Sequence, residues 1–302
     1  MKRILAIILL SLLCLCSCTS AADDGKITVV ATMFPQYDFA RNIAKERANV
    51  ELLLDFGTDA HSYEPTPRDI VKIASADLFI YTGDEMEIWA KTLLESADVK
   101  KAIEGGTLQV IDLSKSVTLI PMHSHEEHDH AEYDTHIWTS AENASKMCGA
   151  IGAAMSRLDA DNRSYYNTNM NEYLQKLSLL SNEISTLRTG EVFFGGSFAF
   201  RYMFADAGIE HHSIYEGCSS HAEPSAAAIA GMVEQIKASG ARYVFYDSLS
   251  EKKIAESIAA ECGAEVLHLH AVHNITKAEF DGGEDYISLM TKNIETLRKA
   301  LS

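Results

Sequence analysis

Residues 64–81, EPTPRDIVKIASADLFIY, contain the helix and the strand that indicate the fold class. Thr66 precedes Pro67 and stands three residues before Asp69, which predicts a helix that starts at Pro67 with Thr66 as its N-cap. Proline suits the first helical position because its missing N–H would have no partner there. The apolar run at 78–81 then predicts a buried strand. Together they form one helix–strand step of a βα repeat.

Short β-branched runs alternate with helical segments on both sides of this stretch, as in βα units around a mostly parallel sheet. The predicted strands are residues 27–31, 50–54, 78–81, 108–112, 191–194, 209–213, 242–246 and 265–268. Between 139 and 189 strand signals are missing, and from Met170 to Leu187 apolar residues recur every three or four positions, as on one face of a long helix. The predicted fold class is α/β: two βα sandwich lobes, each with a mostly parallel four-stranded sheet, joined by a long rigid helix.

The two predicted lobes share a short internal repeat. The triplet 64–66 (Glu-Pro-Thr) and the triplet 223–225 (Glu-Pro-Ser) each precede a helix and then a strand, and His61 and His221 stand just upstream of them. If the lobes are related, both loops lie at the carboxyl edge of a sheet, where open α/β folds bind ligands.

The N-terminus reads as a lipoprotein signal. Lys2 and Arg3 precede an apolar run at 4–13, which is too short to cross a bilayer as a permanent helix. Cys18 follows a small residue, unlike Cys14 and Cys16, and is the predicted lipidation site; an ordinary secretory peptide is the alternative. Either way we expect the folded part outside the cytoplasm, in the periplasm or at the cell surface.

These signals divide the chain into five predicted segments. They are a signal peptide at 1–17, a tether at 18–26, an N-terminal lobe at 27–158 that includes a histidine-rich loop at 122–135, a linking helix at 159–189, and a C-terminal lobe at 190–302.

Charge and cysteine content narrow the choice of ligand. The formal net charge of −17 opposes nucleic-acid binding, because phosphates attract lysine and arginine, and it suits a cation. Beyond Cys18 only Cys148, Cys218 and Cys262 remain, without a CxxC pair, which disfavours a thiolate zinc site. A Cys218–Cys262 disulfide is plausible in an oxidising compartment.

Histidines are the best candidate ligands. The chain has twelve, in four groups, and the imidazole nitrogen is well suited to Zn²⁺ at neutral pH. His61 and His136 each lie in a loop beside an aromatic residue, at the predicted sheet edge of one lobe. The tract at 123–130 alternates histidines with carboxylates, so it is either a low-affinity metal collector or a solvated acidic loop.

Five stretches form a specific combination of motifs: residues 57–69 (GTDAHSYEPTPRD), 134–138 (DTHIW), 198–202 (FAFRY), 223–225 (EPS) and 270–274 (HAVHN). In these stretches the chain resembles the cluster A-I solute-binding proteins of zinc and manganese ABC transporters. The resemblance implies a metal held between two lobes, with His61 and His136 as ligands and the last ligand at about His270. Ser197 stands where the family usually has a further histidine, so His221 is the proposed substitute, with His273, Glu223 or a water as alternatives.

A nitrogen-rich site favours zinc as the transported ion, with manganese as the alternative. We therefore predict a monomeric, lipid-anchored protein that delivers zinc to an ABC permease and its ATPase. A manganese or iron carrier of the same family, and a surface adhesin or metal buffer, are the rival functions. A zinc hydrolase, in which Ser197 marks an open zinc position and Glu64 is the base, is disfavoured because no HExxH or other catalytic motif is found.

Overall fold

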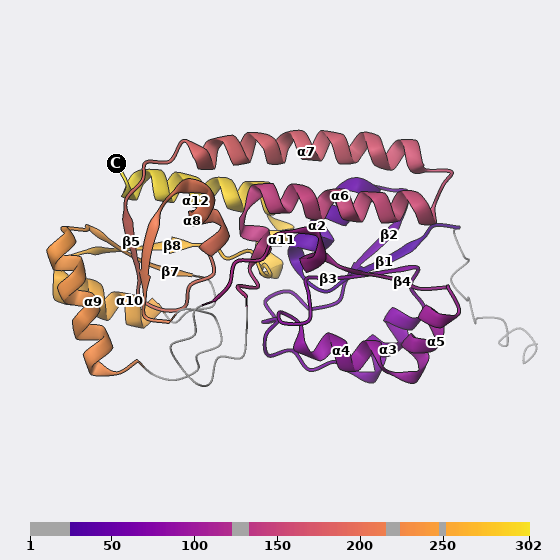
Figure 1. Cartoon of the computed structure of the whole chain (residues 1–302), viewed down its shortest axis with the longest axis horizontal. Coiled ribbons are helices and arrows are strands. Elements are labelled where there is room, and N and C mark those ends of the chain that lie inside the picture. Colours follow the sequence, from indigo (N-terminus) through magenta and orange to yellow (C-terminus); the bar gives the residue numbers. More distant parts are fainter. Residues whose placement is uncertain (1–24, 123–132, 216–223, 248–251) are drawn as a thin grey trace, which may run out of the picture.

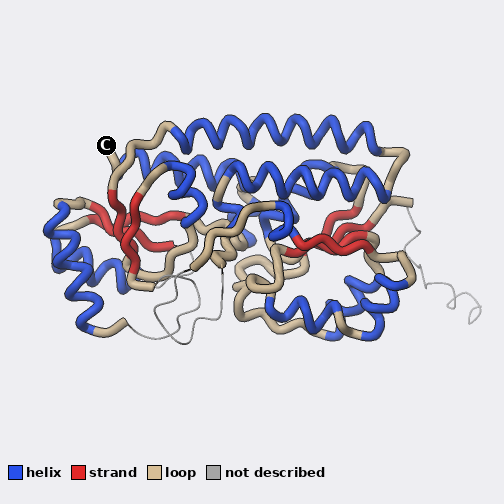
Figure 2. Tube along the Cα trace, in the orientation of Figure 1, coloured by secondary structure: helices blue, strands red, loops and turns tan. Residues whose placement is uncertain are grey.

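The computed structural model describes residues 25–122, 133–215, 224–247 and 252–302. Two lobes lie side by side, each built on one sheet of four parallel strands (Figures 1 and 2). The first sheet has the order β2-β1-β3-β4 and the second β6-β5-β7-β8. The strands are β1 (Thr28–Ala31), β2 (Asn49–Leu52), β3 (Leu78–Tyr81), β4 (Gln109–Asp112), β5 (Glu191–Phe194), β6 (Glu210–Ser213), β7 (Tyr243–Asp247) and β8 (Glu265–Leu269). The predicted fold class is confirmed.

Helices cover both faces of each sheet, so the central strand β3 is buried along its whole length. In the N-terminal lobe, α2 (Phe34–Ala44) and α6 (Ala141–Leu158) lie on one face, and α3 (Pro67–Ala74), α4 (Ile88–Leu94) and α5 (Ala97–Glu104) on the other (Figure 1). In the C-terminal lobe, α8 (Arg201–Ala207) and α12 (Tyr286–Ala300) lie opposite α9 (Ala226–Ser239) and α10 (Lys252–Cys262), and α11 (Lys277–Asp281) lies near the centre of the molecule.

One long helix, α7 (Arg163–Ser185), runs along both lobes (Figure 1). It falls within the predicted range 159–189 and packs on α2 and α6 of the first lobe and on α8 and α12 of the second. The Tyr173 hydroxyl on α7 donates to the buried carboxylate of Asp38 (2.9 Å), which also accepts the backbone N–H of Tyr286 at the start of α12 (3.2 Å). The Asp38 carboxylate on α2 of the N-terminal lobe therefore binds α7, which runs along both lobes, and α12 of the C-terminal lobe.

The predicted helix start at Thr66 is confirmed. The Asp69 carboxylate accepts both the backbone N–H and the hydroxyl of Thr66 (2.7 Å each), closing a capping box. It also accepts the hydroxyl of Tyr63 (2.7 Å), so the loop that follows His61 is tied to the helix.

Several predicted features lie outside the described residues: the signal peptide at 1–17, Cys18, the tract at 123–130, Cys218, His221 and Glu223. The lipid anchor, the collecting loop and the Cys218–Cys262 pairing therefore stay predictions. Within the described ranges, no helix is long and apolar enough to cross a membrane.

Candidate metal centre

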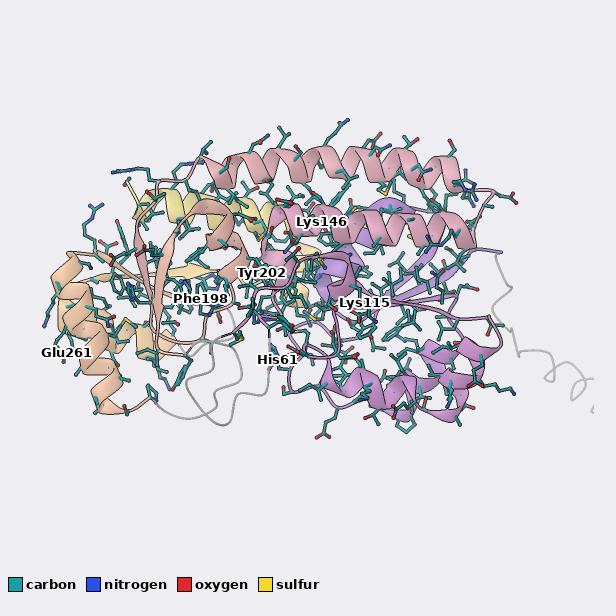
Figure 3. All side chains as sticks on the ribbon, in the orientation of Figure 1. His61, Lys115, Lys146, Phe198, Tyr202 and Glu261 are labelled. Carbon is teal, nitrogen blue, oxygen red and sulfur yellow. The ribbon has the colours of Figure 1, made fainter. Side chains whose placement is uncertain are left out.

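Three imidazoles from distant parts of the chain meet at the junction of the two lobes. His61, His136 and His273 each offer one ring nitrogen, and these nitrogens all lie within 4.8 Å of one another. His61 follows β2, His136 precedes α6, and His273 follows β8 of the other lobe. Figure 3 shows His61 in the middle of the molecule, between the two sheets. Ligands of a tetrahedral zinc are about 3.3 Å apart at bond lengths of about 2.0–2.1 Å, so small ring rotations would close this cluster around an ion.

The ring of His136 is oriented by a buried carboxylate. Asp134 Oδ1 accepts the backbone N–H of His136 and lies 2.9 Å from its ring Nδ1. A carboxylate at this place favours the tautomer protonated on Nδ1, which leaves the Nε2 lone pair for a cation. Burial alone would raise the pKa of Asp134, but His136 and Arg201 together hold it below its ordinary value. The carboxylate therefore stays ionised.

The loop that carries His61 is fixed by contacts to its backbone. Asp59 Oδ1 accepts the N–H of His61 (3.0 Å), and the indole N–H of Trp89 donates to the carbonyl of the preceding residue, Ala60 (3.0 Å). An aspartate that accepts from the backbone two residues on forms an Asx-type turn. The backbone that carries His61 is thus fixed by its own loop and by Trp89 of α4.

His273 differs from His136 because its ring has no hydrogen-bond partner in the described part of the chain. The residue is 2% exposed, and neither ring nitrogen contacts a partner among the described residues. Leaving a buried polar group unsatisfied costs about 1–3 kcal/mol. Burial, followed by repulsion from the neighbouring histidines, holds the pKa of His273 well below its ordinary value. The ring is therefore neutral at physiological pH, and a bound cation would satisfy one of its nitrogens.

A strained backbone places this ring. Val272 has a φ of +58°, in the left-handed region that β-branched residues rarely occupy. The loop is held on both sides, since the indole of Trp138 donates to the carbonyl of Ala271 (2.8 Å) and Phe34 N–H donates to that of His273 (3.2 Å). Strain of this kind is commonly found at functional sites.

His270, which was predicted as a ligand, lies outside this cluster, because the structure brings His273 together with His61 and His136. The Nδ1 of His270 accepts the N–H of Val272 (2.9 Å), so the neutral ring carries its proton on Nε2. That nitrogen lies 3.6 Å from Glu279 Oε1. A protonated nitrogen has no lone pair for a metal, and His270 instead connects the end of β8 to α11.

The fourth ligand stays open. Ser197 is half-buried just after β5, and His221 lies outside the described residues. No carboxylate or thiol of the described part of the chain joins the three imidazoles.

Comparison with known proteins places the chain in a family. The family model described as "ZnuA: Zinc-uptake complex component A periplasmic" matches residues 29–300. The protein therefore belongs to this family of solute-binding transport proteins, as the resemblance of its motifs indicated.

Two relatives illustrate the similarity. The chain is 32% identical over 307 residues to the zinc-binding lipoprotein AdcA of Streptococcus pneumoniae serotype 4, covering 97% of this chain and 60% of that protein. It is also 32% identical over 314 residues to the high-affinity zinc uptake system protein ZnuA of Bacillus subtilis, covering 99% and 96%. The chain thus spans about 60% of the length of the AdcA relatives and nearly all of ZnuA.

Solved structures show the same architecture. The Zn(II)-bound ZnuA-like domain of Streptococcus pneumoniae AdcA has a TM-score of 0.77 at 28% identity, covering 92% of this chain and 99% of that chain. The metal-dependent lipoprotein YcdH of Bacillus subtilis has a TM-score of 0.77 at 30% identity, covering 91% and 99%.

Proposed function

We propose that this protein captures zinc outside the cytoplasm and delivers it to an ABC importer. The observation that supports this best is the meeting of three imidazoles between the lobes. One of them, His273, is buried, and neither of its ring nitrogens has a hydrogen-bond partner among the residues that the structure describes. Such a ring is costly in the empty protein and becomes favourable when a cation binds it.

The donor set favours zinc as the cargo. Three neutral nitrogens match the preference of Zn²⁺, whereas Mn²⁺ prefers more oxygen ligands. We propose His61, His136 and His273 as ligands. The names of two relatives, the zinc-binding lipoprotein AdcA and the zinc uptake protein ZnuA, support zinc as the cargo.

Membership of a zinc-uptake family supports the transporter part of the proposal, and the cysteine motif at the N-terminus supports the lipid anchor. A permease and its ATPase would receive the metal, and a lipid on Cys18 would hold the protein beside them. The role is binding and release, without catalysis.

Zinc titration into chelator-treated protein, in competition with a chromophoric chelator, tests the proposal. We expect one zinc per chain, bound far more tightly than the micromolar range, with Mn²⁺ much weaker. Binding at micromolar affinity or weaker would argue against capture. Deleting residues 123–130 should leave the affinity unchanged and slow only the association with metal, if that tract collects cations.

A further inference from the structure

Asp134 connects a proposed ligand of the N-terminal lobe to a helix of the C-terminal lobe. One carboxylate oxygen faces His136, as described above, and the other lies 3.4 Å from Arg201 Nε at the start of α8. Asp134 is 1% exposed, so its contacts form in a medium where hydrogen bonds are strong.

Tyr202, the next residue of α8, holds the backbone of the same aspartate. Its hydroxyl donates to the carbonyl of Asp134 (2.7 Å) and accepts the N–H of Ile120 (3.0 Å). Asp134 and Ile120 are themselves paired, since the Asp134 N–H donates to the Ile120 carbonyl (2.9 Å). The hydroxyl therefore binds the segment just before the proposed ligand His136 and also the segment at Ile120 that pairs with it.

The helix that supplies both contacts is rooted in the C-terminal lobe. Phe204 of α8 packs against Phe194 of β5 (6.0 Å between ring centroids) and against Phe198 (5.3 Å). Figure 3 shows Tyr202 between Phe198 and the centre of the molecule. Burial raises the pKa of Tyr202 to about 12, so its hydroxyl keeps its proton at physiological pH.

We infer that Tyr202 and Arg201 are positioning residues through which the C-terminal lobe sets the orientation of His136. The inference rests on the proposed function. Its new element is that the C-terminal lobe controls metal affinity through Asp134 as well as through His273. If the lobes moved apart, Asp134 would lose both contacts and His136 its fixed direction, which favours release. By thermodynamic linkage, bound metal would in turn stabilise the lobe arrangement in which α8 contacts Asp134.

The first test is Tyr202→Phe, which keeps the buried ring and removes only the hydroxyl. We expect the dissociation constant for zinc to rise about tenfold or more, since loss of a group that orients a metal ligand typically costs about 10–100-fold. The matched control is Tyr165→Phe, because that hydroxyl donates to the exposed Glu46 away from the site. The control should bind zinc like the wild type.

A second variant tests the contact between Arg201 and the Asp134 carboxylate without changing the charge near the metal. Arg201→Lys keeps the positive charge but loses the planar guanidinium, and we expect a smaller loss of affinity in the same direction. Its control is Arg298→Lys, since Arg298 pairs with Glu183 at 3.5 Å on the surface of α12 and α7. If Tyr202→Phe did not fold, the comparison of Arg201→Lys with Arg298→Lys would test the positioning role.

The metal-free protein gives an independent readout. Nitrogen-15 NMR of the His136 ring should show the Nδ1-protonated tautomer in the wild type and a mixture of tautomers in Tyr202→Phe. Unchanged affinity and an unchanged tautomer in both variants would overturn the positioning role while leaving zinc capture intact. Failure of the wild type to bind zinc would instead overturn the proposed function.

Discussion

His136 and His273 are neighbours, with ring centroids 4.9 Å apart, yet the two lobes hold them differently. The N-terminal lobe orients His136 with the carboxylate of Asp134. The C-terminal lobe supplies His273 from a strained loop and gives its ring no hydrogen bond among the described residues. In the proposed role, His136 would be oriented before the metal arrives, and the ring of His273 would be stabilised only by the metal. The difference suggests that metal binding relieves a cost stored on one side of the junction.

The largest expected effect is on metal binding itself. Replacing either His136 or His273 by Ala should weaken zinc binding by about 3–4 kcal/mol, or a few hundredfold, if a binding free energy of about 10–16 kcal/mol is shared among three or four ligands. Competition with a chelator measures this. His270→Ala is the comparison variant, and its affinity should fall much less, because its ring lies next to Glu279 and binds only the backbone N–H of Val272 beside the cluster. Equal losses in all three variants would contradict the assigned ligand set.

In the metal-free protein, replacing the histidine of one lobe or of the other should change the free energy of unfolding in opposite directions. His273→Leu should raise the free energy of unfolding by about 1–3 kcal/mol, because it removes a buried ring with unsatisfied nitrogens and keeps an apolar side chain of similar size. His136→Leu should lower it by a similar amount, because Asp134 loses a buried partner. Urea unfolding in the presence of a chelator measures both. The comparison between lobes would be wrong if both variants shifted in the same direction.

The pH dependence should come mainly from the C-terminal side of the junction. Burial lowers the pKa of His270 to about 4 and that of His273 well below its ordinary value. Unfolded histidine takes up a proton near pH 6.5, whereas these buried rings do not, so stability is full above about pH 6.5 and is lost as the pH falls below it. Each ring contributes a slope of at most about 1.4 kcal/mol per pH unit.

Urea unfolding of the metal-free protein at a series of pH values tests this dependence. His273→Leu should flatten the slope below about pH 6.5, since one of the depressed groups is gone. An identical slope in the wild type and in this variant would show that His273 is not a buried neutral ring in solution.

The smallest effect is expected at Asp59, which accepts the backbone N–H of His61 rather than contacting its ring. Asp59→Ala removes the acceptor of the His61 N–H, and we expect a loss of zinc affinity of about 1 kcal/mol or less, in line with a single partly exposed hydrogen bond. Chelator competition with Asp281→Ala as control measures it, because Asp281 pairs with the exposed Lys277. A loss as large as that from a missing ligand would mean that Asp59 itself contacts the metal.

Much of the fold was predictable because local signals agree with it. The apolar run at β3, the cap at Thr66 and the apolar face of α7 all lie where periodicity and capping chemistry place them. Short helices such as α5 and α11 are harder to predict, since a segment of one or two turns gives too few periods to recognise.

Part of the candidate site was predictable as well. His61 and His136 were expected to meet because loops at one edge of a parallel sheet lie close together, and the structure places them in one cluster. The roles of Arg201 and Tyr202 were not predicted, since nothing in the chain near α8 indicates that Asp134, far away in sequence, lies against it.

The sequence by itself determined the two βα lobes, the long helix and the presence of histidines at the ends of strands. Only the tertiary structure decided between His270 and His273. Past Leu269 the two-residue alternation of a strand no longer fixes side-chain direction, and the positive φ of Val272 turns the chain so that His273 points to the other lobe. Val272 keeps that strained conformation because the residues beside it, Ala271 and His273, are held by Trp138 and Phe34. Those contacts exist only once both lobes have packed together.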